Sequence, residues 1–174
     1  MASTEKQFIV AFEKHSDELF RHAAMRLSDR ERAVELTQEA YLRAWNYIHK
    51  GGEVREMRAF LFKTLRNLII DEYRKHKTYS LEAMVEQAEG ENVEAILPQD
   101  ETNTLEAAMG RHEGKRALVA LYDLPDPYKE VLMLRYVEGL APREIATILG
   151  ESENAVSVRV HRGLKKLRAI LEPE

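Results

Sequence analysis

The sequence has no cysteine, a single tryptophan and no run of about 18 apolar residues. A chain without cysteine forms no disulfide and offers no thiolate to a metal, which fits a reducing cytoplasm. A chain without a long apolar run has no segment suited to cross a membrane. Its first 20 residues also lack the basic start and continuous apolar core of a signal peptide. We therefore expect a cytoplasmic protein that makes no membrane contact of its own.

The sequence also lacks the short motifs of common enzymes. It contains no GxxxxGK phosphate loop, no GxSxG elbow and no HExxH metal motif. His15 and His22 are seven residues apart and share a helix face if that segment is helical, but no acid–histidine pattern of the HExxH kind accompanies them. We therefore expect no catalytic residue, no metal, no cofactor and no enzymatic activity.

The net charge of −4 conceals a strong segregation along the chain. Residues 1–77 carry 15 Lys/Arg against 12 Asp/Glu, residues 78–114 carry 1 against 9, and residues 115–174 carry 10 against 9. Acidic, turn-forming sequence with few apolar residues rarely builds a core. We expect a flexible acidic linker over residues 78–103, which joins a domain at 1–77 to a domain at 104–174.

The first domain shows helical periodicity and no sustained strand alternation. In its first helix the apolar positions recur every three to four residues, at Phe8, Val10, Ala11, Phe12, His15, Leu19, Phe20, Ala23 and Leu27. Ser28-Asp29 offers a cap for a second helix from about residue 30 to 47, whose apolar stripe includes Val34, and Gly51-Gly52 ends it. A third helix is expected over about 56–76. The fold class is therefore all-α.

The second domain is expected to end in a helix-turn-helix. Helices are predicted over about 104–122 and 128–138, with Pro127 in the first turn of the latter. A short helix then begins at Pro142, Gly150 permits a sharp turn, and Ser152 caps a longer helix that has no acid between Ala155 and Leu171. The buried positions of that helix are predicted to be Val156, Val160, Leu164, Leu167 and Leu171.

The opposite face of the last helix has the composition of a DNA-reading surface. It is predicted to hold Asn154, Ser157, Val158, His161, Arg162 and Lys165. Arginine can bond a guanine edge in bidentate fashion and valine can touch a thymine methyl, whereas Arg143, Lys165 and Lys166 suit phosphates. The alternative is a basic face that is merely solvated.

Two segments of the first domain resemble a known family. Residues 35–45 (ELTQEAYLRAW) and 58–74 (RAFLFKTLRNLIIDEYR) are similar to the first conserved domain of the extracytoplasmic-function sigma factors of bacterial RNA polymerase. Residues 124–171 resemble that family's second conserved domain. The resemblance implies a factor that directs core RNA polymerase to promoters and promotes transcription initiation. Its implied partners are core polymerase and promoter DNA, both as duplex and as melted non-template strand, and an anti-sigma factor that the sequence does not identify.

The resemblance also implies roles for single residues of the first domain. Glu35, Gln38, Glu39 and Arg43 match the surface that docks on the polymerase, although a solvated helix face explains the same residue types. Trp45 matches a family aromatic that we expect in the core rather than in a contact.

The third helix matches the segment that meets the minus-ten element. Asn67, Asp71 and Arg74 lie near one helical face at spacings of four and three. Asn67 can both donate to and accept from a base edge. Lys63 and Arg74 can follow the backbone, and the loop from His49 to Arg55 is where the family forms a base pocket. We predict that Asp71 is a structural partner of Arg74.

The last helix matches the family's readers of the minus-thirty-five element at Asn154, Ser157, Val158, His161 and Arg162. The chain departs from the family pattern at Phe60, which is often Trp, at Ala141-Pro142, and at Asn154, which is commonly Gly. Two alternatives remain: a helix-turn-helix regulator that has no polymerase role, and a protein-interaction module that never touches promoter DNA.

Overall fold

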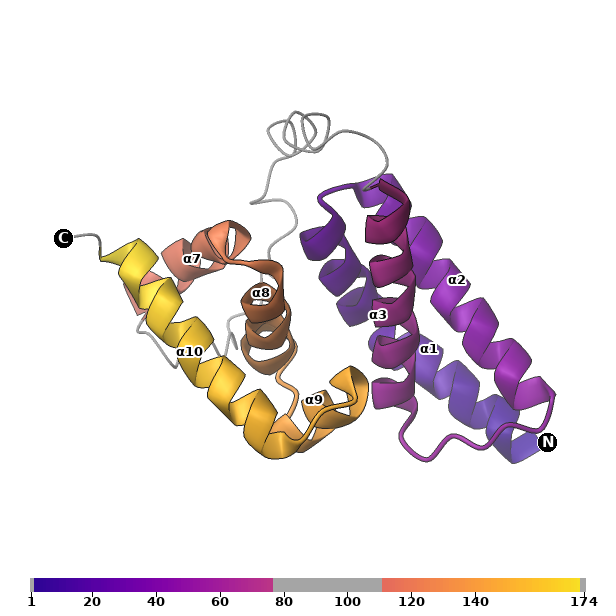
Figure 1. Cartoon of the computed structure of the whole chain (residues 1–174). Coiled ribbons are helices and arrows are strands. Elements are labelled where there is room, and N and C mark those ends of the chain that lie inside the picture. Colours follow the sequence, from indigo (N-terminus) through magenta and orange to yellow (C-terminus); the bar gives the residue numbers. More distant parts are fainter. Residues whose placement is uncertain (1, 77–110, 173–174) are drawn as a thin grey trace. The chain divides into compact units, whose positions relative to one another are not determined.

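The computed structural model describes residues 2–76 and 111–172, which form two separate helical units (Figure 1). Within these residues every regular element is a helix, which confirms the all-α prediction. The predicted linker and the predicted helix start near residue 104 lie outside the described residues. None of the described helices is long and apolar enough to cross a membrane.

The first unit is a bundle of three helices, α1 (Ala2–Leu27), α2 (Arg30–His49) and α3 (Met57–His76), each of which packs on the other two. Fully buried apolar side chains fill its centre, among them Leu19, Leu61, Phe62, Leu65 and Ile69. The predicted cap is present, because the Asp29 carboxylate accepts the N–H of Arg32 at 3.1 Å.

Two ends of α3 are tied to α1 by polar contacts. Near the start of α3, the Arg58 guanidinium donates to both oxygens of Glu18, at 2.9 and 2.8 Å. Near its end, the Tyr73 hydroxyl donates to the carbonyl oxygen of Arg26 at 2.6 Å. These contacts fix the position of α3 along α1, and with it the face that α3 presents to solvent.

The apolar stripe predicted for α1 is wider than the core that it meets. Val10 and Phe12 are 58% and 49% exposed, and Val34 on α2 is also exposed, so the apolar positions of both helices extend beyond the buried core. The physical reason is that, among the described residues, the aromatic contacts of the first half of α1 are made with α2. Phe8 contacts Tyr41 and Trp45, and Phe12 contacts Tyr41. Side chains that point away from α2 there stay in solvent.

The second unit contains α7 (Arg111–Ala120), a 3-10 turn η1 (Leu121–Asp123), α8 (Asp126–Leu132), a π-helical turn η2 (Met133–Val137), α9 (Pro142–Leu149) and α10 (Glu153–Leu171). The helix predicted over 128–138 therefore begins two residues earlier and changes its winding. The N–H of Glu138 bonds to the carbonyl of Met133 at 3.0 Å, and the N–H of Leu140 reaches the carbonyl of Leu134 at 3.0 Å. These hydrogen bonds span five and six residues rather than the four of an α-helix, and the helix ends here.

The helix-turn-helix forms as predicted at its turn. Gly150 takes the left-handed conformation with φ of 68°, and the Ser152 hydroxyl accepts the N–H of Ala155 at 3.1 Å. The predicted buried set of α10 needs correction, because Val160, Leu164 and Leu171 are partly exposed while Gly163 is buried. A Cβ on Gly163 would lie 3.2 Å from Leu132 Cδ1, so α10 packs closely on α8 at this glycine.

Candidate nucleic-acid and polymerase interfaces

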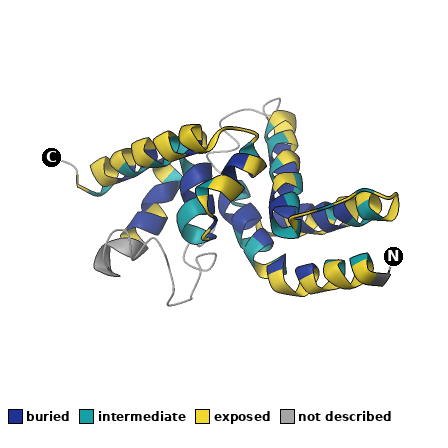
Figure 2. Ribbon diagram, turned by 90° about the horizontal axis from the view of Figure 1, so that it is seen from below, coloured by how far each residue is buried: buried dark blue, intermediate teal, exposed yellow. Residues whose placement is uncertain are grey.

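The outer face of α10 is open along its length (Figure 2). Each residue predicted to read duplex DNA from this helix is exposed: Asn154, Ser157, Val158, His161, Arg162 and Lys165. The reason is the register of the helix, because Val156, Gly163 and Leu167 turn toward the rest of the unit. The arrangement offers amide, hydroxyl, imidazole, methyl and guanidinium groups on one helical face, which suits the varied donors and acceptors of a major groove.

Two neighbouring basic side chains have partners within the unit. Arg159 is half-buried and donates to the Glu151 carboxylate at 2.8 Å, so it braces the turn before α10. The ammonium of Lys166, predicted to contact phosphate, lies 5.4 Å from the ring centroid of Tyr128. Arg143 on α9 is exposed, as expected for a phosphate contact.

On α3 the predicted minus-ten residues form one exposed stripe. Lys63, Asn67, Asp71 and Arg74 are all exposed, and Arg55 is exposed in the loop that precedes the helix. The predicted Asp71–Arg74 pair is wrong: no hydrogen bond or ion pair joins these two described residues. The carboxylate of Asp71 therefore faces solvent without that internal partner.

The acid that has a structural role is the next residue, Glu72. Its carboxylate is buried and accepts two hydrogen bonds of 2.7 Å from Nε and Nη2 of Arg32 on α2, and His76 Nε2 lies 3.0 Å from Oε1. The hydrogen bonds from Arg32 hold the pKa of Glu72 below its ordinary value, against the opposing effect of burial. The same bonds raise the pKa of Arg32. The sequence carried a signal for the burial of Glu72, because this residue continues the apolar spacing of Leu65 and Ile69, but it carried none for the partner Arg32.

All four predicted polymerase contacts lie on α2, and three of them share one hollow. Glu35, Glu39 and Arg43 line a hollow of about 550 Å³ between α2 and α3, and Arg43 Nε donates to Glu39 at 2.9 Å. Asp71 and Arg74 line the same hollow, so the predicted polymerase and minus-ten surfaces meet there. Gln38 is exposed but separate, because it lines a smaller apolar hollow of about 250 Å³ between α1 and α2.

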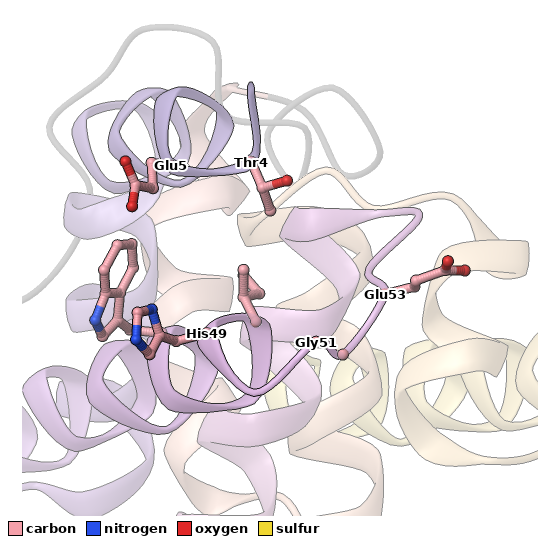
Figure 3. Close-up of a pocket in the computed structure, with 8 residues that line it drawn as sticks. Thr4, Glu5, His49, Gly51 and Glu53 are labelled. Atoms are coloured by element: carbon pink, nitrogen blue, oxygen red, sulfur yellow. The ribbon is translucent and has the colours of Figure 1, made fainter. Parts of the chain in front are cut away.

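The loop between α2 and α3 borders a third hollow, of about 250 Å³ (Figure 3). Its walls come from the start of α1, the end of α2 and the loop: Thr4, Glu5, Trp45, Ile48, His49, Gly51, Gly52 and Glu53. The rings of Trp45 and His49 stack, with centroids 5.9 Å apart and an angle of 21° between the ring planes. Trp45 is half-buried at this wall, whereas a core position was predicted for it. No residue of the exposed α3 stripe lines the hollow, although the loop itself was the predicted base pocket. Among the described residues, no group of three or more His, Asp or Glu is placed to hold a metal ion.

Comparison with known proteins decides the family. Residues 11–79 match the model of sigma-70 region 2, and residues 115–167 match that of sigma-70 region 4. The chain is 30% identical over 161 residues to the ECF RNA polymerase sigma factor SigW of Bacillus subtilis, which covers 88% of this chain and 83% of SigW. The chain belongs to the extracytoplasmic-function sigma factors. This sigma factor is also 32% identical over 164 residues to SigL of Mycobacterium tuberculosis, with 92% and 86% of the two chains covered.

Solved structures show the same fold. The sigma factor RpoE of Bartonella quintana, solved with the anti-sigma factor NepR, has a TM-score of 0.68 at 21% identity, with 97% of this chain and 99% of that chain covered. CnrH, solved with the cytosolic domain of CnrY, has a TM-score of 0.66 at 23% identity, with 96% and 88% covered. As a sigma factor, the protein directs RNA polymerase to promoters, where its partners are core polymerase and promoter DNA. A DNA-binding regulator without a polymerase role is not favoured.

Proposed function

We propose that the two units of this sigma factor divide promoter recognition between them. The domain at 1–77 binds core polymerase and the melted minus-ten strand, the domain at 104–174 binds the duplex minus-thirty-five element, and residues 78–103 join them. The observation that carries this proposal is that every predicted DNA residue on α10 and α3 is exposed. The helices themselves are held in place, α10 by its Ser152 cap and buried face, and α3 by its buried face and its polar contacts with α1.

On α10, Arg162 and Asn154 are assigned to base edges because their donor and acceptor groups discriminate between base pairs. Ser157 and His161 add polar contacts, and Val158 contacts a thymine methyl. Lys165 and Arg143 bind phosphates, which positions the helix without reading the sequence.

On α3, Asn67 is assigned to the edge of an unpaired base. Asp71, which makes no pair with Arg74, accepts a hydrogen bond from a base amino group. Lys63, Arg74 and Arg55 neutralise the phosphates of the same strand, and this makes binding weaker at high salt.

On α2, Glu35, Glu39 and Arg43 form one charged docking patch for core polymerase, and Gln38 extends it toward α1. The polymerase supplies the chemistry of RNA synthesis, so the sigma factor itself is not an enzyme and needs no cofactor or metal. We assign its action to the cytoplasm, where the polymerase works. Because RpoE and CnrH were each solved with a bound partner chain, we also propose that an anti-sigma factor binds this chain.

The reader-helix assignment is tested by Arg162→Ala in holoenzyme. Loss of one bidentate base contact costs about 1–3 kcal/mol, so discrimination between the preferred upstream element and its single-base variants should weaken at one position. The measurement is competition binding of duplex promoters at fixed salt. The matched control is Arg168→Ala, which removes the same charge from an exposed position one and a half turns further along α10. If both variants lose affinity equally for all sequences, Arg162 is a phosphate contact and the assignment fails.

A further inference from the structure

One ion pair joins the turn of the helix-turn-helix to the second turn of α10. Nη2 of Arg159 donates to Oε1 of Glu151 at 2.8 Å, across eight residues of sequence. Within residues 111–172, no other hydrogen bond or ion pair involves the Glu151 carboxylate. The side chains of Glu151 and Arg159 are 32% and 27% exposed, so a ligand in solution can reach the pair.

The turn itself is formed by contacts that do not involve the Glu151 carboxylate. Gly150 takes the left-handed conformation, and the N–H of Glu151 donates to the carbonyl of Ala146 at 3.0 Å. The Ser152 hydroxyl then caps α10. These contacts fix the point from which the Glu151 side chain extends, and its negative charge is an addition to a turn that is already held.

Arg159 lies on one flank of the predicted DNA face of α10. It precedes Arg162 by three residues and Lys166 by seven, so the three cations follow one side of the helix. A helix with its side chains is about 10–12 Å wide and a major groove is about 12 Å wide, so the flanks of a bound helix meet phosphates. Arg159 therefore has the position of a phosphate contact, but a carboxylate already occupies its guanidinium.

A DNA phosphate and the Glu151 carboxylate compete for Arg159. Both are oxyanions that accept hydrogen bonds from a guanidinium, and a carboxylate beside a phosphate repels it. The pair with Glu151 must open before Arg159 can bind DNA, and while it is closed the two charges cancel. By contrast, no ion pair to a described residue involves the exposed cations Arg143, Arg162 and Lys165.

We propose that Glu151 keeps Arg159 from the DNA backbone and thereby lowers the affinity of this sigma factor for duplex DNA of any sequence. The proposal rests on the proposed binding of duplex DNA by α10. Phosphate contacts carry no sequence information, so the pair weakens the sequence-independent part of binding and leaves base discrimination unchanged. Weaker sequence-independent binding shortens the time that the factor spends on DNA without a promoter.

The test measures the affinity of holoenzyme for a duplex with the upstream element and for a scrambled duplex, between about 50 and 200 mM salt. Glu151→Gln keeps the length of the side chain and removes its charge. Because DNA then has no exposed ion pair to open, affinity for both duplexes should rise about 2- to 5-fold. The slope of log K against log salt should steepen by about 0.9, as for one added phosphate contact, and the ratio of the two affinities should stay the same.

Arg159→Ala identifies the cation that Glu151→Gln releases. Alone, it should leave the salt slope unchanged, because the pair already keeps Arg159 from phosphates. Combined with Glu151→Gln, it should cancel the steeper slope and the gain in affinity. If Arg159→Ala alone lowers the slope by about 0.9, Arg159 is an ordinary phosphate contact and the proposal is contradicted.

The matched control is Glu153→Gln, which removes the same charge two residues away, at an exposed position in the first turn of α10. Among the described residues, no hydrogen bond or ion pair involves the Glu153 carboxylate. Any gain in affinity from this control should be the same with and without Arg159→Ala, as for independent positions. If Glu151→Gln behaves in the same way, its effect is that of any lost acid and the proposal fails. Because the pair is partly exposed, the variants should keep wild-type hydrogen-exchange protection at the amides from 146 to 156.

Arg162→Ala in the same assay separates this proposal from the proposed role of α10. If Arg162→Ala relaxes discrimination while Glu151→Gln leaves affinity and slope as in the wild type, the competition for Arg159 fails and the role of α10 stands. If neither substitution changes duplex binding, the proposed role of α10 fails together with the competition.

Discussion

His22 is a titratable side chain that is buried in the first unit. Its ring packs edge-on against Phe62 with centroids 5.6 Å apart, and its Nδ1 is buried without a hydrogen-bond partner. Burial lowers the pKa of His22 well below its ordinary value, and the positive charges of Arg26 and Arg21 lower it further. The folded unit therefore holds this histidine neutral.

We predict that His22→Phe reduces the acid sensitivity of the first unit. Below about pH 6.5 the unfolded chain binds a proton at His22 that the folded chain refuses, so stability falls as the pH falls, by up to about 1.4 kcal/mol per pH unit. Urea unfolding followed by the fluorescence of Trp45, the single tryptophan of the chain, reports on this unit alone. The free energy of unfolding of His22→Phe should decline less steeply between pH 6.5 and 5 than that of the wild type. His161→Gln should keep the wild-type dependence of this free energy on pH. Equal slopes for the wild type and His22→Phe would contradict the assignment.

Glu72→Gln tests the buried ion pair between α2 and α3. The change leaves Arg32 without its carboxylate, and because the Arg32 side chain is 34% exposed and partly solvated, we expect a loss of about 1–3 kcal/mol rather than the full cost of a buried charge. Because the pKa of Glu72 is lowered on folding, its contribution is present above the ordinary carboxyl pKa and is lost as the pH falls through the folded value. The readout is again Trp45 fluorescence in urea. The exposed partner of Arg32 provides the control: Glu35→Gln should change stability by no more than about 0.5 kcal/mol, and a loss equal to that of Glu72→Gln would refute the distinction.

At the scale of the helices, the turn of the helix-turn-helix depends on backbone conformation rather than on packing. A Cβ on Gly150 would meet no atom within 4 Å, so the cost of a substitution comes from its φ of 68°. We predict that Gly150→Ala destabilises the second unit by about 1–2 kcal/mol, while Gly150→Asn, which tolerates the left-handed region, recovers most of the loss. Hydrogen exchange of the amides from 146 to 156 measures this opening. Equal protection in Gly150→Ala and the wild type would show that the turn is not strained by a side chain.

The helices whose ends carry a local chemical signal could be predicted from sequence. Asp29, Pro142, Gly150 and Ser152 each act within one turn of the chain, so their effect can be read locally. The π-helical turn over Met133–Val137 has no such signal, because no side chain caps its start. Burial is predicted less well because it depends on residues that are distant in sequence. Gly163 is covered because Leu132 lies against it, and Phe12 is exposed because nothing described lies beyond it.

The candidate sites show the same contrast between features that are local in sequence and features that depend on distant residues. Helical periodicity placed the proposed DNA-reading residues of α10 and the stripe of α3 on exposed faces, since a face is a local property. It could not show that Glu72 rather than Asp71 makes the internal pair, because Arg32 is 40 residues away. Nor could it show that Glu39 and Arg74 line one hollow.

At the scale of the whole molecule, the proposed mode of promoter recognition depends on two units that carry different chemistry. The segments that contain them are near neutral or slightly basic, while residues 78–114 carry nine acids against one base. Overall charge therefore gives no indication of DNA binding, and the local exposed faces do. The chain matches region 2 and then region 4 of the family, in this order along the sequence. This order agrees with the proposal that one factor binds two promoter elements.

The most direct test of this account is transcription from a promoter library by core polymerase with and without the chain, with the RNA start sites sequenced. We predict that the chain concentrates the start sites downstream of one pair of sequence elements at fixed spacing. Arg162→Ala should relax only the upstream element and Asn67→Ala only the downstream one. Start sites distributed as they are for core polymerase alone would contradict the account.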